Sequence, residues 1–209
     1  MAETFGMVGR TRVAVLVSGT GTLLQSILDN QGQEYSVVLV VADVACAALD
    51  RAEAAGVPTA VVPLGADREE WNKQLAAAVD KHAPDIVVSA GFMKIVGAPF
   101  LERFEGRLIN THPALLPSFP GAHAVRDALA YGVKVTGTTV HYIDAGVDTG
   151  EIIAQRAVDI RPDETEEDLH ERIKIEERAL IVDVLRRVLP PANDPNDPNN
   201  HGKVRFANG

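Results

Sequence analysis

The chain has few of the residues that would mark it as a secreted, disulfide-bonded or membrane protein. Cys46 is the only cysteine among 209 residues, so no disulfide can form within the chain and a reducing compartment is expected. Charged residues interrupt every apolar run before it reaches the length that spans a bilayer. Residues 1–10 lack the apolar core of a secretory signal. We therefore expect a cytoplasmic protein with no membrane partner.

Positive charge is also scarce. The sequence has 20 Lys and Arg against 29 Asp and Glu, which gives a formal net charge of −9. Such a surface repels phosphate backbones, so no nucleic-acid partner is expected. Six histidines and the single cysteine are scattered without the short ligand spacings of a zinc site, and we expect no metal. Small-molecule substrates remain as the expected partners, because a few local cations can bind an anionic ligand. The sequence leaves the oligomeric state open, with a homodimer among the alternatives.

What the chain does have is short apolar segments at regular intervals. With 46% hydrophobic residues, it can bury one sizeable core, so one domain is expected. The patterns predict strands and helices in alternation, with strands at 12–17, 36–42, 58–63, 85–89 and 107–110 and helices at 23–29, 45–55 and 67–82. This alternation predicts an α/β fold, in which a mostly parallel twisted sheet carries helices on both faces.

The last third of the chain follows a different pattern. Two alternating segments, 134–143 and 151–160, follow a helix at 122–131 and predict an antiparallel hairpin that makes the sheet mixed. A long amphipathic helix is expected over 165–189, with Thr165 as its N-cap. Residues 190–209 form a polar tail rich in Pro, Asn and Asp. The tail leaves room for a final short strand at 203–206.

A glycine-containing loop joins the first strand to the first helix. Residues 18–22 read Ser-Gly-Thr-Gly-Thr, and such a loop lets backbone N–H groups converge on an anion at the helix N-terminus. Leu24 occupies the position where the dinucleotide fingerprint has a third glycine, so a single phosphate is favoured over a pyrophosphate. The alternative is a tight turn with no ligand.

Two further segments are candidates for ligand binding. Residues 90–96 are mostly apolar and follow the strand at 85–89, a position that suits a slot for a flat ring. Ordinary packing under a loop is the alternative. Arg68 lies in the first turn of its helix, where a cation opposes the helix dipole. It is either a solvated surface residue or a contact to an anionic ligand tail.

The chemistry is expected at Asn110, His112 and Asp148. Asn110 and His112 are two apart in an extended run, so their side chains project to the same side. Pro113 disfavours helical geometry at His112, which places the imidazole just past a strand end, where open sheets bind ligands. Asp148 lies in a glycine-flanked loop able to fold back over that edge.

An amide, an imidazole and a carboxylate suit the transfer of an acyl unit to an amine. Asn110 and His112 can donate hydrogen bonds to the oxyanion, while Asp148 polarises His112 and assists proton transfer. An amine attacks directly, so no serine or cysteine nucleophile is required. Each residue alone also has a structural interpretation, as a turn, packing or loop-capping residue. His123 and His141 are weaker candidates, and His141 is expected to be a packed or hydrogen-bonded strand residue.

These segments together resemble the folate-dependent formyltransferases, and among them the glycinamide ribonucleotide formyltransferases of purine biosynthesis. The resemblance covers residues 12 to about 189, so residues 1–189 would be one formyltransferase domain with the Rossmann-like fold of the family. It implies transfer of formyl from the co-substrate 10-formyltetrahydrofolate to the amino group of glycinamide ribonucleotide. The motifs that carry it are SGTGT at 18–22, AGFM at 90–93, NTHPALLP at 110–117, PGAH at 120–123, GTTVH at 137–141 and DTGEI at 148–152.

The resemblance also implies roles for individual residues. It makes Asn110, His112 and Asp148 the catalytic residues. It places the ribonucleotide, with the substrate amine at Glu177, against Gly19, Thr20, Gly21, Thr22, Leu23, Lys174, Ile175, Glu176 and Glu177. It places the folate against Arg68, Met93, Lys94, Ile95, Val96, Asn110, Asp144, Ala145, Gly146, Val147 and Asp148.

The chain departs from the family pattern at three of these positions. Relatives commonly have asparagine at Thr20 and Leu23, so phosphate binding here would depend on backbone N–H groups and the Thr22 hydroxyl. Lys94 replaces a common arginine and exchanges a planar fork for a point charge.

Three other functions compete with this interpretation. A formyltetrahydrofolate hydrolase would use water in place of the amine. A methionyl-tRNA formyltransferase would carry a further basic domain, against which the length and acidity of this chain argue. A non-catalytic nucleotide-binding module would use residues 19–22 as its ligand loop.

Overall fold

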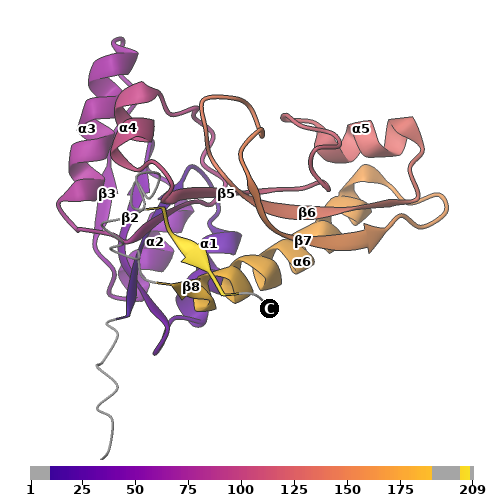
Figure 1. Ribbon diagram of the computed structural model, residues 1–209, viewed down its shortest axis with the longest axis horizontal. Helices are drawn as coiled ribbons and strands as arrows, with labels where there is room; N and C mark the ends of the chain where they lie inside the picture. The colour runs from indigo at the N-terminus through magenta and orange to yellow at the C-terminus, as the bar shows by residue number, and fades with distance from the viewer. Residues whose placement is uncertain (1–9, 190–202, 208–209) are drawn as a thin grey trace, which may run out of the picture.

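The computed structural model describes residues 10–189 and 203–207. Within this part of the chain, seven strands form one sheet in the order β3-β2-β1-β4-β5-β6-β7. Figure 1 shows the antiparallel strands β6 and β7 side by side. The first five pair in parallel and the last two antiparallel. The mostly parallel α/β fold is therefore confirmed. The strands are β1 (Thr11–Val17), β2 (Tyr35–Ala42), β3 (Thr59–Val61), β4 (Ile86–Ser89), β5 (Leu108–His112), β6 (Val135–Tyr142) and β7 (Ile152–Asp159).

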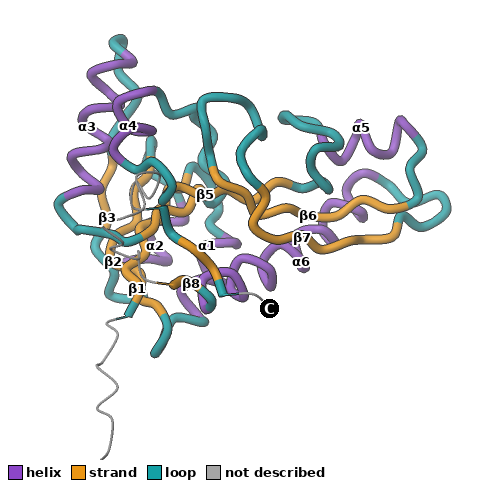
Figure 2. The backbone as a smooth tube through the Cα atoms, in the orientation of Figure 1, coloured by secondary structure: helices purple, strands orange, loops and turns teal. Residues whose placement is uncertain are grey.

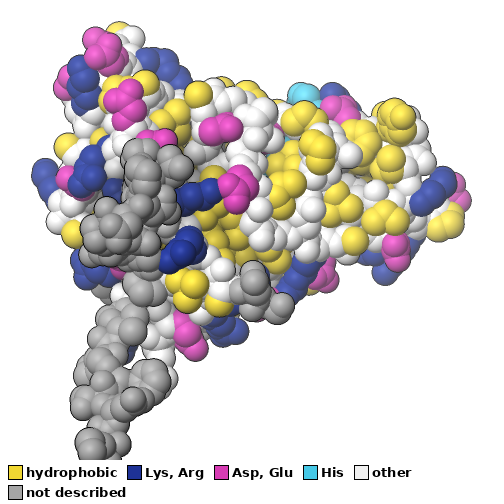
Figure 3. All heavy atoms as spheres, in the orientation of Figure 1, with side chains coloured by type: hydrophobic (Ala, Val, Ile, Leu, Met, Phe, Trp, Pro, Cys, Tyr) yellow, Lys and Arg dark blue, Asp and Glu magenta, His cyan; other side chains and the backbone are white. Residues whose placement is uncertain are grey.

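Helices cover both faces of the sheet (Figure 2). Alternate residues of β1 show the division, because Val13 packs with α1, α2 and α6 in one core cluster while Leu16 packs with α3 and α4 in another. Lys, Arg, Asp and Glu are interspersed over α3, as expected of a solvated helix face (Figure 3). The helices are α1 (Thr22–Asp29), α2 (Ala47–Ala54), α3 (Arg68–Asp80), α4 (Ala98–Arg103), α5 (Ala124–Tyr131) and α6 (Glu166–Arg186). No helix in the described segments combines the length and apolarity needed to cross a membrane.

The structure differs from several local predictions. The helix expected over 165–189 ends at Arg186, because residues 188–189 form a short strand. Cys46 was expected within a helix, but it is the N-cap residue before α2 and packs, partly buried, against the core. His112 was expected just past a strand end, but it is the last residue of β5 and pairs with Thr139 of β6. Helix α4 was not predicted, because six residues are too short for a helical period to show.

The end of the described chain returns to the body. Arg205–Phe206 (β9) pairs antiparallel with Val188–Leu189 (β8). Val204 is fully buried, and its N–H donates to the Gly106 carbonyl at 2.9 Å. The Tyr142 hydroxyl donates to the carbonyl of Val204. The polar segment predicted at 190–201 lies outside the described residues.

Candidate active site

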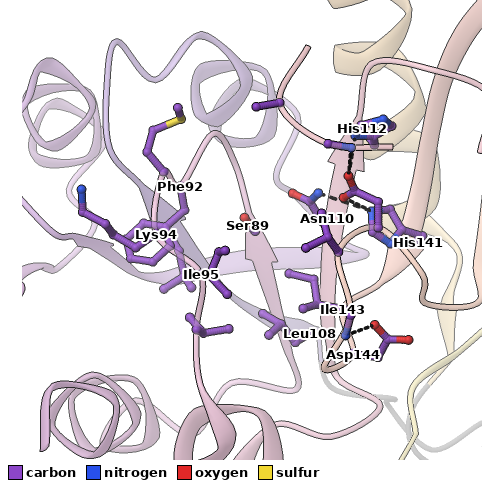
Figure 4. Close-up of a pocket in the computed structure, with 18 of the residues that line it drawn as sticks. Ser89, Phe92, Lys94, Ile95, Leu108, Asn110, His112, His141, Ile143 and Asp144 are labelled. Carbon is purple, nitrogen blue, oxygen red and sulfur yellow. Dashed lines mark hydrogen bonds and ion pairs between the residues drawn. The ribbon is translucent and has the colours of Figure 1, made fainter. Parts of the chain in front are cut away.

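A cavity of about 500 Å³ opens at the carboxyl ends of the central strands. β2 lies on one side of β1 and β4 on the other, so the strand order changes direction at β1. Open α/β sheets bind ligands at such a switch point. Figure 4 shows Asn110, His112 and His141 together on one side of the cavity and Phe92 and Lys94 on the other. The residues that line the cavity include Leu16, Ser89, Phe92, Met93, Lys94, Ile95, Val96, Leu108, Asn110, His112, Pro113, Gly121, His141, Ile143, Asp144, Gly146, Val147 and Asp148.

The structure brings the three predicted catalytic residues to this cavity. Asp148 Oδ2 lies 3.3 Å from His112 Nδ1, and Asp148 Oδ1 lies 3.7 Å from His141 Nε2. Asn110 Nδ2 lies 3.3 Å from the same His141 nitrogen. Carboxylate, imidazole and carboxamide thus form one connected group, which includes His141, a weaker candidate from the sequence alone.

Strand pairing and loop geometry explain this arrangement. Asn110 and His141 are directly opposite each other in the antiparallel pair of β5 and β6, which places their side chains in contact. Asp148 has a φ of 54°, in the left-handed region that Asp tolerates better than most residues. The Gly121 N–H donates to Asp148 Oδ2 at 2.8 Å and holds the carboxylate in place.

Two acceptor groups hold the His112 ring in place. Its Nε2 lies 2.8 Å from the Phe119 carbonyl oxygen, and its Nδ1 faces Asp148. A carbonyl only accepts hydrogen bonds, so Nε2 donates to Phe119 and Nδ1 faces the carboxylate. The imidazole of His112 is therefore held between a backbone carbonyl and Asp148 beside the cavity.

The pKa of His141 is lowered from its ordinary value. Burial lowers the pKa of the ring, and this outweighs the opposing effects of Asp148 and the backbone bond to Tyr142. The sequence analysis predicted a packed or hydrogen-bonded residue, and the ring is indeed 2% exposed. What the sequence could not show is that this packed ring also lines the cavity.

Most of the predicted folate residues line the same cavity. Residues 93–96, Asp144, Gly146 and Val147 do so, while Arg68 and Ala145 do not. Arg68 instead donates through Nη2 to the Ile95 carbonyl at 2.6 Å, so it braces the loop that borders the cavity. Met93 and Ile95 are 77% and 72% exposed, whereas Ala90 and Val96 are buried and Phe92 packs against the core. Packing therefore accounts for only part of this apolar segment.

The loop at 92–96 is tied to the loop after β1. The Met93 N–H donates to Ser18 Oγ at 2.8 Å, and the Ser18 hydroxyl donates to Asp43 Oδ1 at 2.6 Å. Lys94 Nζ lies 3.3 Å from the other oxygen of the Asp43 carboxylate. The lysine that departs from the family pattern is therefore paired within the protein and holds one wall of the cavity.

The predicted phosphate loop lies at the N-terminus of α1, outside the cavity lining. Gly19, Thr20 and Thr22 are exposed, and the first turn of α1 carries no acidic residue, so an anion could approach its N–H groups. The Leu23 side chain is buried in the core, which leaves only its backbone N–H for a ligand.

The four residues of the second predicted ribonucleotide segment, 174–177, lie within α6, so their side chains have different surroundings. Lys174 pairs with Glu171, Ile175 is exposed, and Glu176 lies 3.3 Å from Arg156. Glu177 faces β5, where burial raises its pKa against the lowering effect of a hydrogen bond from Thr111 and of nearby cations. Of the four, Glu177 is the residue placed beside β5.

The described residues contain no ligand set for a metal ion. Across residues 10–189 and 203–207, no group of three or more His, Cys, Asp or Glu side chains is placed to hold a metal ion.

Gly21 has a structural reason to be glycine, apart from any ligand. Its φ is 72°, and an added Cβ would lie 2.7 Å from the Cβ of Ala48 in α2. We expect Gly21→Ala to lower the free energy of unfolding by about 1–3 kcal/mol, through backbone strain and overpacking. Urea denaturation measures this loss. Gly19→Ala is the matched control, because nothing lies within 4 Å of its added Cβ; equal losses in both variants would contradict the prediction.

Comparisons with known proteins agree with the geometry. Residues 11–185 match the family described as formyl transferase. The chain is 55% identical over 175 residues to the phosphoribosylglycinamide formyltransferase of Mycobacterium tuberculosis (strain CDC 1551 / Oshkosh), a match that covers 82% of this chain and 81% of the relative. It is 40% identical over 185 residues to the trifunctional purine biosynthetic protein adenosine-3 of Homo sapiens, covering 86% of this chain and 18% of that protein.

A solved structure extends the similarity to the fold. The crystal structure of glycinamide ribonucleotide transformylase 1 from Symbiobacterium toebii superposes with a TM-score of 0.84 at 38% sequence identity, over 95% of each chain. The similarity therefore reaches both the sequence motifs and the arrangement of the sheet and helices.

Proposed function

The chain belongs to the formyl transferase family, and we propose that it transfers the formyl group of 10-formyltetrahydrofolate to the amino group of glycinamide ribonucleotide in purine biosynthesis. The family resemblance predicted from the sequence motifs is confirmed. The observation that carries the proposal is one cavity in which Asn110, His112 and Asp148 face the loop at 92–96. The relative from Mycobacterium tuberculosis, which matches over most of both chains, supports the same acceptor.

The proposed reaction begins with direct attack of the amine on the formyl carbon. A new C–N bond forms and the carbonyl oxygen becomes an oxyanion. The Asn110 amide donates to it, and His112 donates to it from Nε2 after exchanging the Phe119 carbonyl for the substrate oxygen. Each well-placed donor typically supplies about 2.7–4 kcal/mol. The attacking nitrogen loses a proton to Asp148, directly or through water, and the bond to the folate nitrogen breaks as that nitrogen is protonated.

Asp148 has two roles in this proposal. Its carboxylate lies 3.3 Å from His112 Nδ1, so it polarises the ring that donates to the oxyanion. Its side chain is only 14% exposed, which strengthens the interaction relative to water. The same position allows it to receive the proton from the amine.

The ribonucleotide is proposed to extend from β5, which carries Asn110 and His112, to the N-terminus of α1. Its phosphate would accept hydrogen bonds from the backbone of residues 19–23 and from the Thr22 hydroxyl. Its amine end would lie near Glu177, and the folate would occupy the cavity between residues 92–96 and 144–148. The hydrogen bond from Met93 N–H to Ser18 supports this arrangement, because it places the two loops side by side at the same sheet edge.

The proposal is tested by supplying 10-formyltetrahydrofolate with and without glycinamide ribonucleotide and identifying the products. We expect tetrahydrofolate and formylated ribonucleotide in equal amounts, and little formate when the ribonucleotide is omitted. Formate released at the same rate without the ribonucleotide would identify a hydrolase. No turnover with either acceptor would remove the enzyme proposal.

The phosphate loop is tested by Thr22→Val, which removes a hydroxyl and keeps the side-chain shape. We expect the Kd for glycinamide ribonucleotide to rise about 10-fold, the effect of losing one hydrogen bond to a charged group. The Kd for a folate analogue should stay within about twofold. Calorimetric titration measures both, and Thr59→Val on β3 is the control for the same exchange elsewhere. Equal losses for the two ligands would misplace the phosphate site.

A further inference from the structure

We propose that His141 is a positioning residue for formyl transfer, which holds the Asn110 carboxamide so that one of its N–H groups is free for the formyl oxygen. This inference rests on the proposed function of the same cavity. It is carried by two contacts of the His141 ring, one with its own strand and one with Asn110.

The first contact determines which ring nitrogen carries the proton. His141 Nδ1 lies 2.9 Å from the Tyr142 carbonyl oxygen, which can only accept, so Nδ1 is the protonated nitrogen. The ring is 2% exposed, and burial lowers its pKa. A neutral ring with its proton on Nδ1 presents a bare lone pair at Nε2.

The second contact then determines how the Asn110 amide is turned. An acceptor 3.3 Å from the amide requires the NH2 group to face it, because an amide oxygen in that place would oppose two lone pairs. One N–H of Asn110 is used in this bond. The other is fixed by the planarity of the amide and points away from His141, available to the substrate oxygen.

Fixing the amide matters because an oxyanion donor acts only if it is oriented before the reaction. A carboxamide can rotate and present its oxygen, which would repel the oxyanion. His141 removes that alternative, since its Nε2 cannot donate to the Asn110 oxygen while the ring is neutral. The antiparallel pairing of the two residues in β5 and β6 makes the contact part of the sheet.

Protonation of His141 would reverse this arrangement. Asp148 and Asp144 favour the charged ring, and His112 disfavours it, but burial has the largest effect. As the pH falls below 6.5 toward the lowered pKa, Nε2 acquires a proton and becomes a donor. Protonated Nε2 would then donate to Asp148 Oδ1, which lies 3.7 Å away. The Asn110 amide would lose its acceptor.

The test compares His141→Phe, which keeps a ring without an acceptor, with His141→Gln, which restores an acceptor oxygen. In His141→Phe we expect kcat to fall about 10- to 100-fold while KM for the folate stays within about twofold, as for a misoriented catalytic group. His141→Gln should recover at least about fivefold of that loss, because its oxygen can accept from Asn110. His82→Gln is the control for a histidine exchange distant from the cavity.

A second readout does not depend on turnover. The side-chain amide resonances of Asn110 in the ¹H–¹⁵N spectrum of the wild-type protein should shift with a midpoint below 6.5. The same shift should be absent from His141→Phe, although His112 and Asp148 remain in that variant.

The outcomes separate the inference from the proposed function. A kcat within about twofold of wild type in a folded His141→Phe protein would overturn the positioning role. So would an Asn110 shift that persists without the ring, because another group would then be its source. If the wild-type protein transfers no formyl group, the proposed function fails, while the Asn110 resonances still decide whether His141 orients the amide.

Discussion

His112→Ala is expected to lower kcat for formyl transfer by about 100- to 1,000-fold, the effect of removing one oxyanion donor from a preorganised site. The ring is 4% exposed and lies against both Phe119 and Asp148. Its loss therefore removes a hydrogen-bond donor and also leaves the Asp148 carboxylate without its imidazole partner. KM for the folate should change little, because the interaction is strongest in the transition state.

Folding must be measured beside activity in this variant. Loss of the buried ring leaves the Phe119 carbonyl without its partner, at a cost of about 1–3 kcal/mol. A domain of ordinary stability, about 5–15 kcal/mol, remains folded after such a loss. His82→Ala is the matched control, and its kcat should equal that of wild type. A folded His112→Ala protein with full kcat would exclude the imidazole from the mechanism.

Asp148→Asn is expected to lower kcat by about 100-fold or more, the range in which proton transfer by a positioned group contributes. The substitution keeps the shape of the side chain and removes its charge and its capacity to take a proton. Asparagine also tolerates the left-handed backbone at this position, where φ is 54°. The free energy of unfolding should therefore change by less than about 1 kcal/mol, so the loss of activity has a chemical cause.

The two substitutions should not be additive. Asp148 acts in part through His112, so the double variant is expected to be about as slow as the slower single variant. Steady-state kinetics of the wild type, both single variants and the double variant measure the coupling. Multiplied losses would mean that carboxylate and imidazole act independently, and an unchanged kcat in Asp148→Asn would remove the carboxylate from the reaction.

The core strands could be predicted from the sequence because each is a short apolar run bounded by turn residues. Val13 and Leu16 are both fully buried, on opposite faces of β1, so the run is continuous and has no polar alternation. Helix α4 was missed because a helix of six residues is too short to show a periodic pattern. Cys46 was placed inside a helix because its alanine-rich surroundings do not reveal the first helical residue.

The site could be predicted only in part, because two of its features depend on tertiary register. Asn110 and His141 are opposite each other only when β5 and β6 pair antiparallel in one register. The 22 residues that separate the two strands, 113–134, do not reveal that register. Arg68 is predicted either as a solvated residue or as a ligand contact, and the sequence does not reveal that its guanidinium donates to the Ile95 carbonyl. That contact depends on where α3 packs against the loop after β4. Sequence spacing identifies the reactive residue types, and the sheet determines which of them meet.

The orientation of the formyl donor in the cavity tests the account most directly. A crystal structure with a formyl-bearing or formyl-mimicking folate and glycinamide ribonucleotide would locate the reacting atoms. We predict that the formyl oxygen lies within about 3 Å of Asn110 Nδ2 and of His112 Nε2, where it replaces the Phe119 carbonyl. The amine should lie on the side of Glu177 and the phosphate at residues 19–23. A complex in which the formyl group lies away from Asn110 and His112, with both substrates ordered, would contradict the account.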